Sequence, residues 1–192
     1  MLAATVDANF TSAKDSLNSK QTVALKLFKT GTYDHHNIAK REFDILHRVK
    51  GHPNIVEVYD FVQGNGQVEV PNCLPRDIED TFAQYRTGST IEKDATYFTM
   101  ELTKNGDFFD VIKATGGLKN LALTRFLFKQ LCEGVKHIHS VGGYSHLDLK
   151  LDNILIGNDF KLKICDFGFA MDKATRIEKK YGTPSYMAPE IN

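Results

Sequence analysis

Three short motifs in the last third of the chain restrict its fold more than any other feature. They are HLDLKLDN at residues 146–153, DFG at residues 166–168 and APE at residues 188–190. Apolar runs at 154–156 and 162–164 flank a Gly-Asn-Asp turn between the first two motifs, which predicts a short β-hairpin. A lone Asp in a loop usually caps a helix or makes a turn. That explanation does not account for Asp148, which has a Lys two positions later, an Asn five positions later and a hairpin beyond it.

The composition is that of an ordinary globular protein. At 192 residues, 42% hydrophobic and 25% charged, the chain can form one large domain or two small ones. The 24 basic and 24 acidic residues balance, which gives no reason to expect a nucleic-acid or membrane partner. The three cysteines show no zinc or disulfide spacing, so we expect a reducing, cytoplasmic location. The oligomeric state stays open.

Hydrophobic periodicity predicts a first half rich in strands and a second half rich in helix. Strands are expected at residues 21–28, 55–62 and 96–102, and helices at residues 37–50, 107–114 and 121–140. Residues 63–95 carry glycine, proline and many charges without a period, which predicts a long polar loop or insertion. We expect two domains, residues 1–102 with this insertion and residues 103–192.

Together the motifs resemble those of the protein kinase family. The HRDLKxxN catalytic loop of that family is similar to HLDLKLDN, and the DFG and APE motifs follow in the same order. The resemblance covers most of residues 20–192. It implies an α+β, bilobal kinase-like fold, in which an antiparallel-sheet N-lobe with one main helix precedes an incomplete, mainly helical C-lobe that ends after the activation segment.

The resemblance assigns chemical roles to four residues of these motifs. Asp148 would accept the proton of the substrate hydroxyl, and Lys150 would neutralise the transferring phosphoryl group. Asn153 and Asp166 would hold Mg²⁺ through oxygen atoms, which a hard cation prefers. General-base help of this kind is typically worth ~10²–10⁴ in rate.

A lysine and a glutamate in the first half of the chain are expected to form an ion pair. Lys26 lies in a VALK strand similar to the VAIK strand of the family, on the face opposite three aliphatic residues. Glu42 falls on the apolar stripe of the helix expected at 37–50, and a carboxylate there is unfavourable unless it is paired. The other members of this stripe are Ile38, Ile45, Leu46 and Val49. In the family such a pair orients the α- and β-phosphates; the alternative is a solvated Glu42 at the edge of the stripe.

The resemblance also implies a nucleotide site. Its expected lining residues are Ala24, Met100, Glu101, Thr103, Asp107 and Leu155. Residues 100–103 match the family's hinge, whose backbone groups at Glu101 and Thr103 would bond adenine. Ala24 and Leu155 would enclose the ring, Met100 would guard the pocket behind it, and Asp107 would take the ribose hydroxyls. The alternative for Met100 and Leu155 is a plain core position.

Departures from the family pattern carry expectations of their own. No glycine occurs before Gly31, although the glycine-rich phosphate loop is expected near residues 3–8, so we expect either weakened ATP binding or a misread N-terminus. Leu147 replaces the arginine that binds an activation-segment phosphate, so we expect activity that does not depend on phosphorylation there. The helices that usually follow APE are not in this sequence, which predicts an uncovered apolar face on the helix at 121–140.

These residues favour a serine/threonine protein kinase that transfers the γ-phosphate of ATP to protein Ser or Thr hydroxyls. Within the family, Gly182-Thr183 ahead of APE and Lys150 after Asp148 form the Ser/Thr pattern. The expected cofactors are ATP and Mg²⁺, and the expected partner is a protein substrate. The alternatives are a catalytically impaired kinase-fold binding or scaffold module, and a fragment of a longer kinase. The substrate, the pathway and the regulator stay open.

Overall fold

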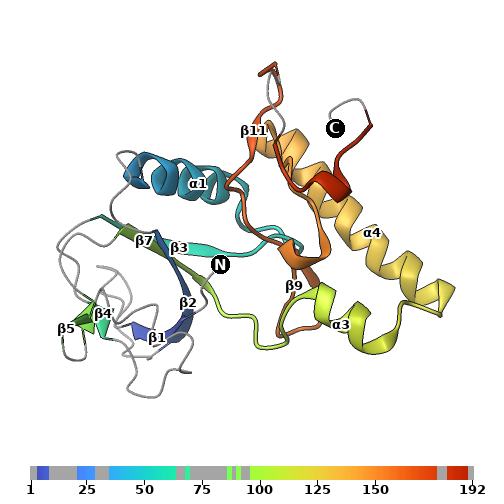
Figure 1. Ribbon diagram of the computed structural model, residues 1–192, viewed down its shortest axis with the longest axis horizontal. Coiled ribbons are helices and arrows are strands. Elements are labelled where there is room, and N and C mark those ends of the chain that lie inside the picture. Colours follow the sequence, from blue (N-terminus) through green and yellow to red (C-terminus); the bar gives the residue numbers. More distant parts are fainter. Residues whose placement is uncertain are drawn as a thin grey trace. The chain divides into compact units, whose positions relative to one another are not determined.

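The computed structural model describes residues 4–8, 21–28, 35–63, 68–69, 86–87, 90–91, 96–176 and 181–189 (Figure 1). The chain divides into two compact units, one made of Met1–Lys40 and Val58–Leu102, the other of Arg41–Glu57 and Thr103–Asn192. The sequence-based division after residue 102 assigns residues 41–57 to the first domain, whereas their contacts group them with the second unit.

The first unit is built on a four-stranded antiparallel sheet with the strand order β1-β2-β7-β3. β2 (Gln21–Phe28) pairs with β7 (Thr96–Glu101), and β3 (Val58–Gln63) pairs with the other side of β7. Residues 96–100 are all buried. Because successive side chains of a strand point to opposite faces, β7 is covered on both of its faces.

β1 (Ala4–Ala8) pairs antiparallel with β2, from Ala4 opposite Leu25 to Ala8 opposite Gln21. The prediction of a phosphate loop near residues 3–8 is therefore wrong for residues 4–8. The connection between two strands can vary widely in length at little cost, so counting back from Lys26 does not locate a loop. Residues 9–20, which connect β1 to β2, lie outside the described residues and also contain no glycine, so weakened ATP binding stays a prediction.

The predicted insertion contains short strands that the sequence did not indicate. β4 (Val68–Glu69), β6 (Thr90–Ile91) and β5 (Arg86–Thr87) form a three-stranded sheet in the order β4-β6-β5. Two residues are too few to show a period, which is why the pattern predicted only a loop. The rest of residues 64–95 lies outside the described residues.

α1 (His35–Val49) is the helix predicted at 37–50. Four members of its apolar stripe are buried as predicted: Glu42, Ile45, Leu46 and Val49. The prediction for Ile38 is wrong, because this side chain is 50% exposed and Ala39 is buried instead. Ala39 precedes Glu42 by three positions and Leu46 by seven, so it continues the same helical face. Gly51 follows the helix at φ +84°.

The residues after α1 anchor it in the second unit. Asn54 Nδ2 donates to Gln130 Oε1 at 3.0 Å and to the Leu162 carbonyl at 2.8 Å. Gln130 Oε1 also accepts from the Leu162 amide at 3.0 Å, and the Val56 amide donates to the Ile164 carbonyl at 3.0 Å. These contacts account for the grouping of residues 41–57 with the second unit.

The second unit is mainly helical. Asp107 is the N-cap of α3 (Phe108–Thr115), and Asn120 is the N-cap of α4 (Leu121–His137). Each cap side chain accepts a hydrogen bond from a backbone amide of the first turn. A π-helical turn at Ile138–Gly142 continues α4, so the α-helix ends earlier than predicted. The predicted hairpin is confirmed as β9 (Ile154–Ile156) and β10 (Leu162–Ile164).

The core of this unit gathers around Phe108, Ile154 and Leu162, with Leu127 and Leu131 of α4 packed against it. Four apolar side chains of α4 that flank this packed stripe are 45–65% exposed: Leu121, Leu123, Phe126 and Phe128. The side of α4 opposite the stripe is charged, with Lys129 and Glu133 exposed on it. The exposed apolar surface that the sequence predicts for this helix is therefore made of these flanking side chains. In the part of the chain that the structure describes, no helix has the length and apolarity needed to cross a membrane.

Candidate active site

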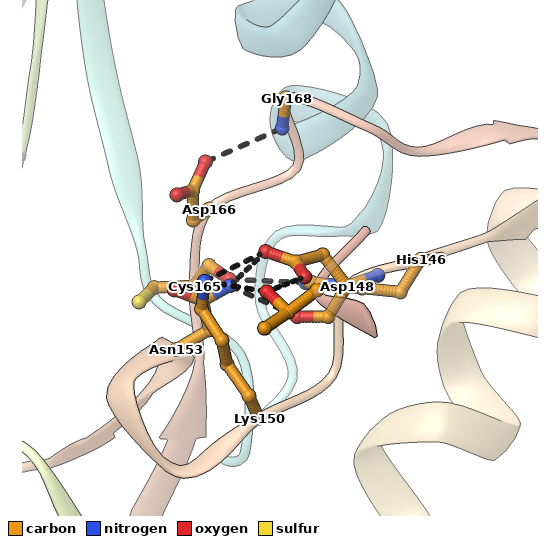
Figure 2. A network of polar contacts seen from close by, with 8 residues as sticks. His146, Asp148, Lys150, Asn153, Cys165, Asp166 and Gly168 are labelled. Carbon is orange, nitrogen blue, oxygen red and sulfur yellow. Dashed lines mark hydrogen bonds and ion pairs between the residues drawn. The ribbon is translucent and has the colours of Figure 1, made fainter. Parts of the chain in front are cut away.

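Two backbone pairings bring the polar motifs together. β8 (Tyr144–Ser145), directly before HLDLKLDN, pairs antiparallel with β11 (Met171–Asp172), which follows DFG. The Cys165 amide donates to the Asn153 carbonyl at 3.0 Å. Asn153 comes directly before β9, and Asp166 comes just after β10. The two motifs therefore meet at the open end of the hairpin (Figure 2).

The Asp148 carboxylate lies within a network of three donors (Figure 2). Thr183 Oγ1 donates to Oδ1 at 2.7 Å, Asn153 Nδ2 donates to Oδ2 at 3.0 Å, and Lys150 Nζ lies 3.2 Å from Oδ2. Asp148 is 6% exposed. A buried carboxylate needs such partners because its desolvation is otherwise unfavourable. The three donors fix the orientation of both oxygens.

Thr183 is the member of this network that the sequence did not assign to the site. Its hydroxyl also accepts from Lys150 Nζ at 3.0 Å, so it bridges the lysine and the carboxylate. Gly182, just before it, has φ +98°, and a Cβ there would lie 2.3 Å from the Leu147 carbonyl oxygen. Glycine alone permits this approach. The Gly-Thr pair ahead of APE was the signal for it in the sequence.

His146 connects the two motifs. Its Nε2 lies 3.0 Å from the Cys165 carbonyl oxygen, and the Asp148 amide lies 3.3 Å from its Nδ1. A carbonyl can only accept and an amide can only donate, so the imidazole carries its proton on Nε2. Its ring meets the fully buried Phe167 ring edge-on at 4.8 Å between centroids.

Two residues of the motifs hold positive φ without being glycine. Leu147 has φ +66° and Asp166 has φ +62°. Non-glycine residues in this region cost of order 1–3 kcal/mol and persist where surrounding contacts hold them. Such positions concentrate at functional sites, and here both stand next to the network around Asp148.

The donor set beside this network suits a hard cation. Asn153 Nδ2 is engaged with the Asp148 carbonyl at 2.9 Å and its carboxylate at 3.0 Å, so the amide oxygen is the atom it can offer a cation. Asp166, whose Oδ1 lies 3.4 Å from the Gly168 amide, adds carboxylate oxygens. Among the described residues no group of three or more His, Cys, Asp or Glu could hold a metal ion. One amide and one carboxylate fit a magnesium ion that completes its shell with phosphate and water.

In the first unit, the sheet register places three predicted residues on one face. Ala24 lies opposite Met100, which also lies opposite Val58 on β3. Directly opposed residues of antiparallel strands share a face, and so do residues two apart. Ala24, Lys26 and Met100 therefore lie on the same face of the sheet.

The two members of the predicted ion pair have different surroundings. Lys26 Nζ lies 5.5 Å from the Phe28 ring centroid and 6.0 Å from that of Phe98, within cation–π range. Glu42, in the second unit, is 2% exposed, so its predicted burial is confirmed. An ion pair between Lys26 and Glu42 stays a prediction.

Of the remaining nucleotide-site residues, Glu101 belongs to the first unit, and Thr103, Asp107 and Leu155 belong to the second. Asp107 and Leu155 face each other in an antiparallel bridge. Asp107 Oδ1 accepts from the Asp110 amide at 2.9 Å, so helix capping already explains this residue, and its contact with ribose stays a prediction. Glu101 is the last residue of β7, and Thr103 lies outside any helix or strand.

The family model for the protein kinase domain matches residues 10–192. The chain belongs to the protein kinase family. This membership confirms the resemblance seen in the motifs and the mixed α and β fold class.

Several curated kinases are similar to this chain. It is 34% identical over 153 residues to the "Serine/threonine-protein kinase H1 homolog" of Pinctada fucata, covering 77% of this chain and 36% of that protein. It is 43% identical over 99 residues to the "Probable serine/threonine-protein kinase fhkC" of Dictyostelium discoideum, and this match covers 50% of this chain and 16% of that protein. It is 30% identical over 187 residues to "CBL-interacting protein kinase 5" of Oryza sativa subsp. japonica, and this match covers 92% of this chain and 33% of that protein. The chain thus spans 16–36% of the length of these three relatives.

Leu147 is where this chain departs most clearly from the HRD pattern. Its side chain lines a cavity of about 210 Å³ together with Tyr181, Tyr186 and Met187. A leucine offers no charge to a phosphate at this position. Activity that is independent of activation-segment phosphorylation stays a prediction.

Proposed function

We propose that this protein is a serine/threonine kinase that transfers the γ-phosphoryl group of ATP to a protein hydroxyl. The observation that carries the proposal is the Asp148 carboxylate, held by Thr183, Asn153 and Lys150 at 2.7–3.2 Å. A base for phosphoryl transfer must be oriented before the substrate arrives, because positioning and charge stabilisation supply most of the catalysis.

In this proposal Asp148 accepts the proton of the substrate Ser or Thr hydroxyl. The hydroxyl oxygen forms a bond to the γ-phosphorus as the bond from that phosphorus to the β–γ bridging oxygen breaks, which yields phosphoprotein and ADP. Lys150 lies 3.2 Å from the base and can also reach the transferring group, where its charge offsets the charge that develops.

Asn153 and Asp166 are the residues that would hold Mg²⁺. When bound, the cation would neutralise phosphate charge and orient the nucleotide. Asp166 would present its carboxylate to it from a backbone at φ +62°, and Asn153 would present its amide oxygen while its nitrogen stays on Asp148.

The nucleotide site is proposed on the residues that the resemblance to the kinase family implies. Ala24, Met100 and Leu155 would enclose adenine, backbone groups of Glu101 and Thr103 would bond it, and Asp107 would take the ribose. Lys26, paired with Glu42, would bind the α- and β-phosphates. The shared sheet face of Ala24, Lys26 and Met100 supports this arrangement. A cytoplasmic location is a further proposal, supported by Cys132 and Cys165, which are both free thiols.

The test is phosphoryl transfer from labelled Mg·ATP to a Ser/Thr peptide library. Asp148→Asn should lower kcat by about 10²-fold or more, because general-base catalysis typically contributes that much. The matched control is Asp159→Asn, an exposed aspartate in the turn between β9 and β10, which should leave activity unchanged.

Equal signals from the unmodified protein and Asp148→Asn would assign the activity to a contaminating kinase and overturn the proposal. Mg²⁺-dependent ATP binding without transfer would instead support a kinase-fold binding module. Asp166→Asn should weaken ATP binding in the presence of Mg²⁺ and should have a smaller effect in its absence.

A further inference from the structure

The turn that carries Asp166 is held in place from several sides. The Ala170 amide donates to the Phe167 carbonyl at 3.0 Å, and both residues are fully buried. Asp166 itself has φ +62°, a conformation that surrounding contacts must maintain. The position of its carboxylate therefore depends on whatever fixes residues 166–170.

Helix α1 supplies two neighbouring contacts to this turn. Arg41 Nη2 donates to the Ala170 carbonyl, across 129 positions of sequence. The next residue, Glu42, reaches the other part of the turn, since a Cβ placed on Gly168 would lie 3.6 Å from Glu42 Oε2 and 3.4 Å from Asp166 Oδ1. The helix behind Gly168 in Figure 2 is α1.

The chemistry of the Arg41 contact suits a positioning role. The carbonyl of a buried residue needs a hydrogen-bond partner, and a guanidinium group gives it a charged donor in a rigid plane. Arg41 is an exposed residue whose guanidinium makes a part-buried hydrogen bond to Ala170, so replacing it removes little buried surface. Its loss would release the turn while leaving the core intact.

We infer that Arg41 is a positioning residue that holds the turn Asp166–Ala170, and through it the magnesium-binding carboxylate, against α1. This inference rests on the proposed function. Arg41 acts through the Ala170 backbone, and any movement of α1 at this point would be transmitted to the carboxylate of Asp166.

The experiment compares Arg41→Ala, Arg41→Lys and Arg48→Ala in the full chain. Arg48 is the matched control, because it lies two turns further along α1 and its guanidinium stacks on Tyr144 at 5.8 Å. Arg41→Ala should lower kcat roughly tenfold and raise the half-saturating Mg²⁺ concentration several-fold, while KM for the peptide stays unchanged. The reason is that a misplaced Asp166 carboxylate weakens magnesium binding and stabilisation of the transition state rather than peptide binding. Arg41→Lys should recover part of both losses, and Arg48→Ala should match the unmodified protein.

Hydrogen exchange gives a readout that does not need activity. The Ala170 amide should exchange faster in Arg41→Ala than in the unmodified protein and Arg48→Ala. Unchanged exchange together with an unchanged Mg²⁺ requirement in Arg41→Ala would overturn the inference, and so would equal effects in Arg48→Ala. If the unmodified protein transfers no phosphate, the proposed function fails, while the exchange result still decides whether Arg41 holds the turn.

Discussion

The hydroxyl of Thr183 offers the sharpest test of how this site orients its base. Thr183→Val keeps the shape of the side chain but removes the oxygen that donates to Asp148 at 2.7 Å and accepts from Lys150 at 3.0 Å. Thr183→Ser keeps that oxygen. The two variants therefore separate the contribution of the hydroxyl hydrogen bonds to activity from the contribution of the methyl group.

The size of the effect follows from the contacts that are lost and kept. A hydrogen bond to a charged group is worth about 1.5–3 kcal/mol, and Thr183→Val removes two. Lys150 stays 3.2 Å from Asp148, and Asn153 still donates to it at 3.0 Å, so part of the orientation survives. We expect a loss of about 2 kcal/mol in transition-state stabilisation, or ~30-fold in kcat/KM.

Steady-state transfer measured over a range of peptide concentrations below saturation gives kcat/KM and so measures this effect. Thr183→Ser should stay within a few-fold of the unmodified protein, and the thermal midpoint of Thr183→Val should change little. Thr175→Val is the matched control, since Thr175 is exposed in the same segment. The reasoning is refuted if Thr183→Val keeps full activity, or if Thr183→Ser is as impaired as Thr183→Val.

Two further predictions concern the backbone and the pH. Gly182→Ala should abolish most transfer activity, because its Cβ would lie 2.3 Å from the Leu147 carbonyl oxygen. A peptide transfer assay measures this loss, and circular dichroism checks that the variant is folded. Normal activity would contradict the geometry. Burial, with a smaller contribution from the nearby His137, lowers the pKa of His52 below 6.5. The unfolded chain then binds more protons, so the stability from His52 is present above pH 6.5 and is lost as the pH falls through the lowered pKa of the folded protein. Urea unfolding between roughly pH 7.5 and pH 5 should show this loss, and His52→Gln should flatten it; an equal slope in His52→Gln would exclude His52 as the cause.

Local pattern in the sequence predicts most of the regular elements. β2 and the hairpin of β9 and β10 appear at the residues that alternation and the Gly-Asn-Asp turn indicate. The burial of Glu42 follows from its place on the helical stripe. These features are set by side chains that lie within a few positions of one another, so periodicity is enough to find them.

The resemblance of the motifs to those of the kinase family implies the site's chemistry. It implies that Asp148, Lys150, Asn153 and Asp166 share one site, and the backbone pairing of Cys165 with Asn153 brings the two motifs together. What the motifs could not give is how the carboxylate is held.

Tertiary structure decided the contacts that cross long stretches of chain. Thr183 joins Asp148 from 35 positions away, and Arg41 reaches Ala170 from 129. The strand at Ala4–Ala8 owes its place to pairing with β2. Each of these depends on which segments the fold places side by side. Hydrophobic periodicity cannot predict which distant segments come together. The free energy of a long-range hydrogen bond depends on its partner and not on the neighbouring sequence.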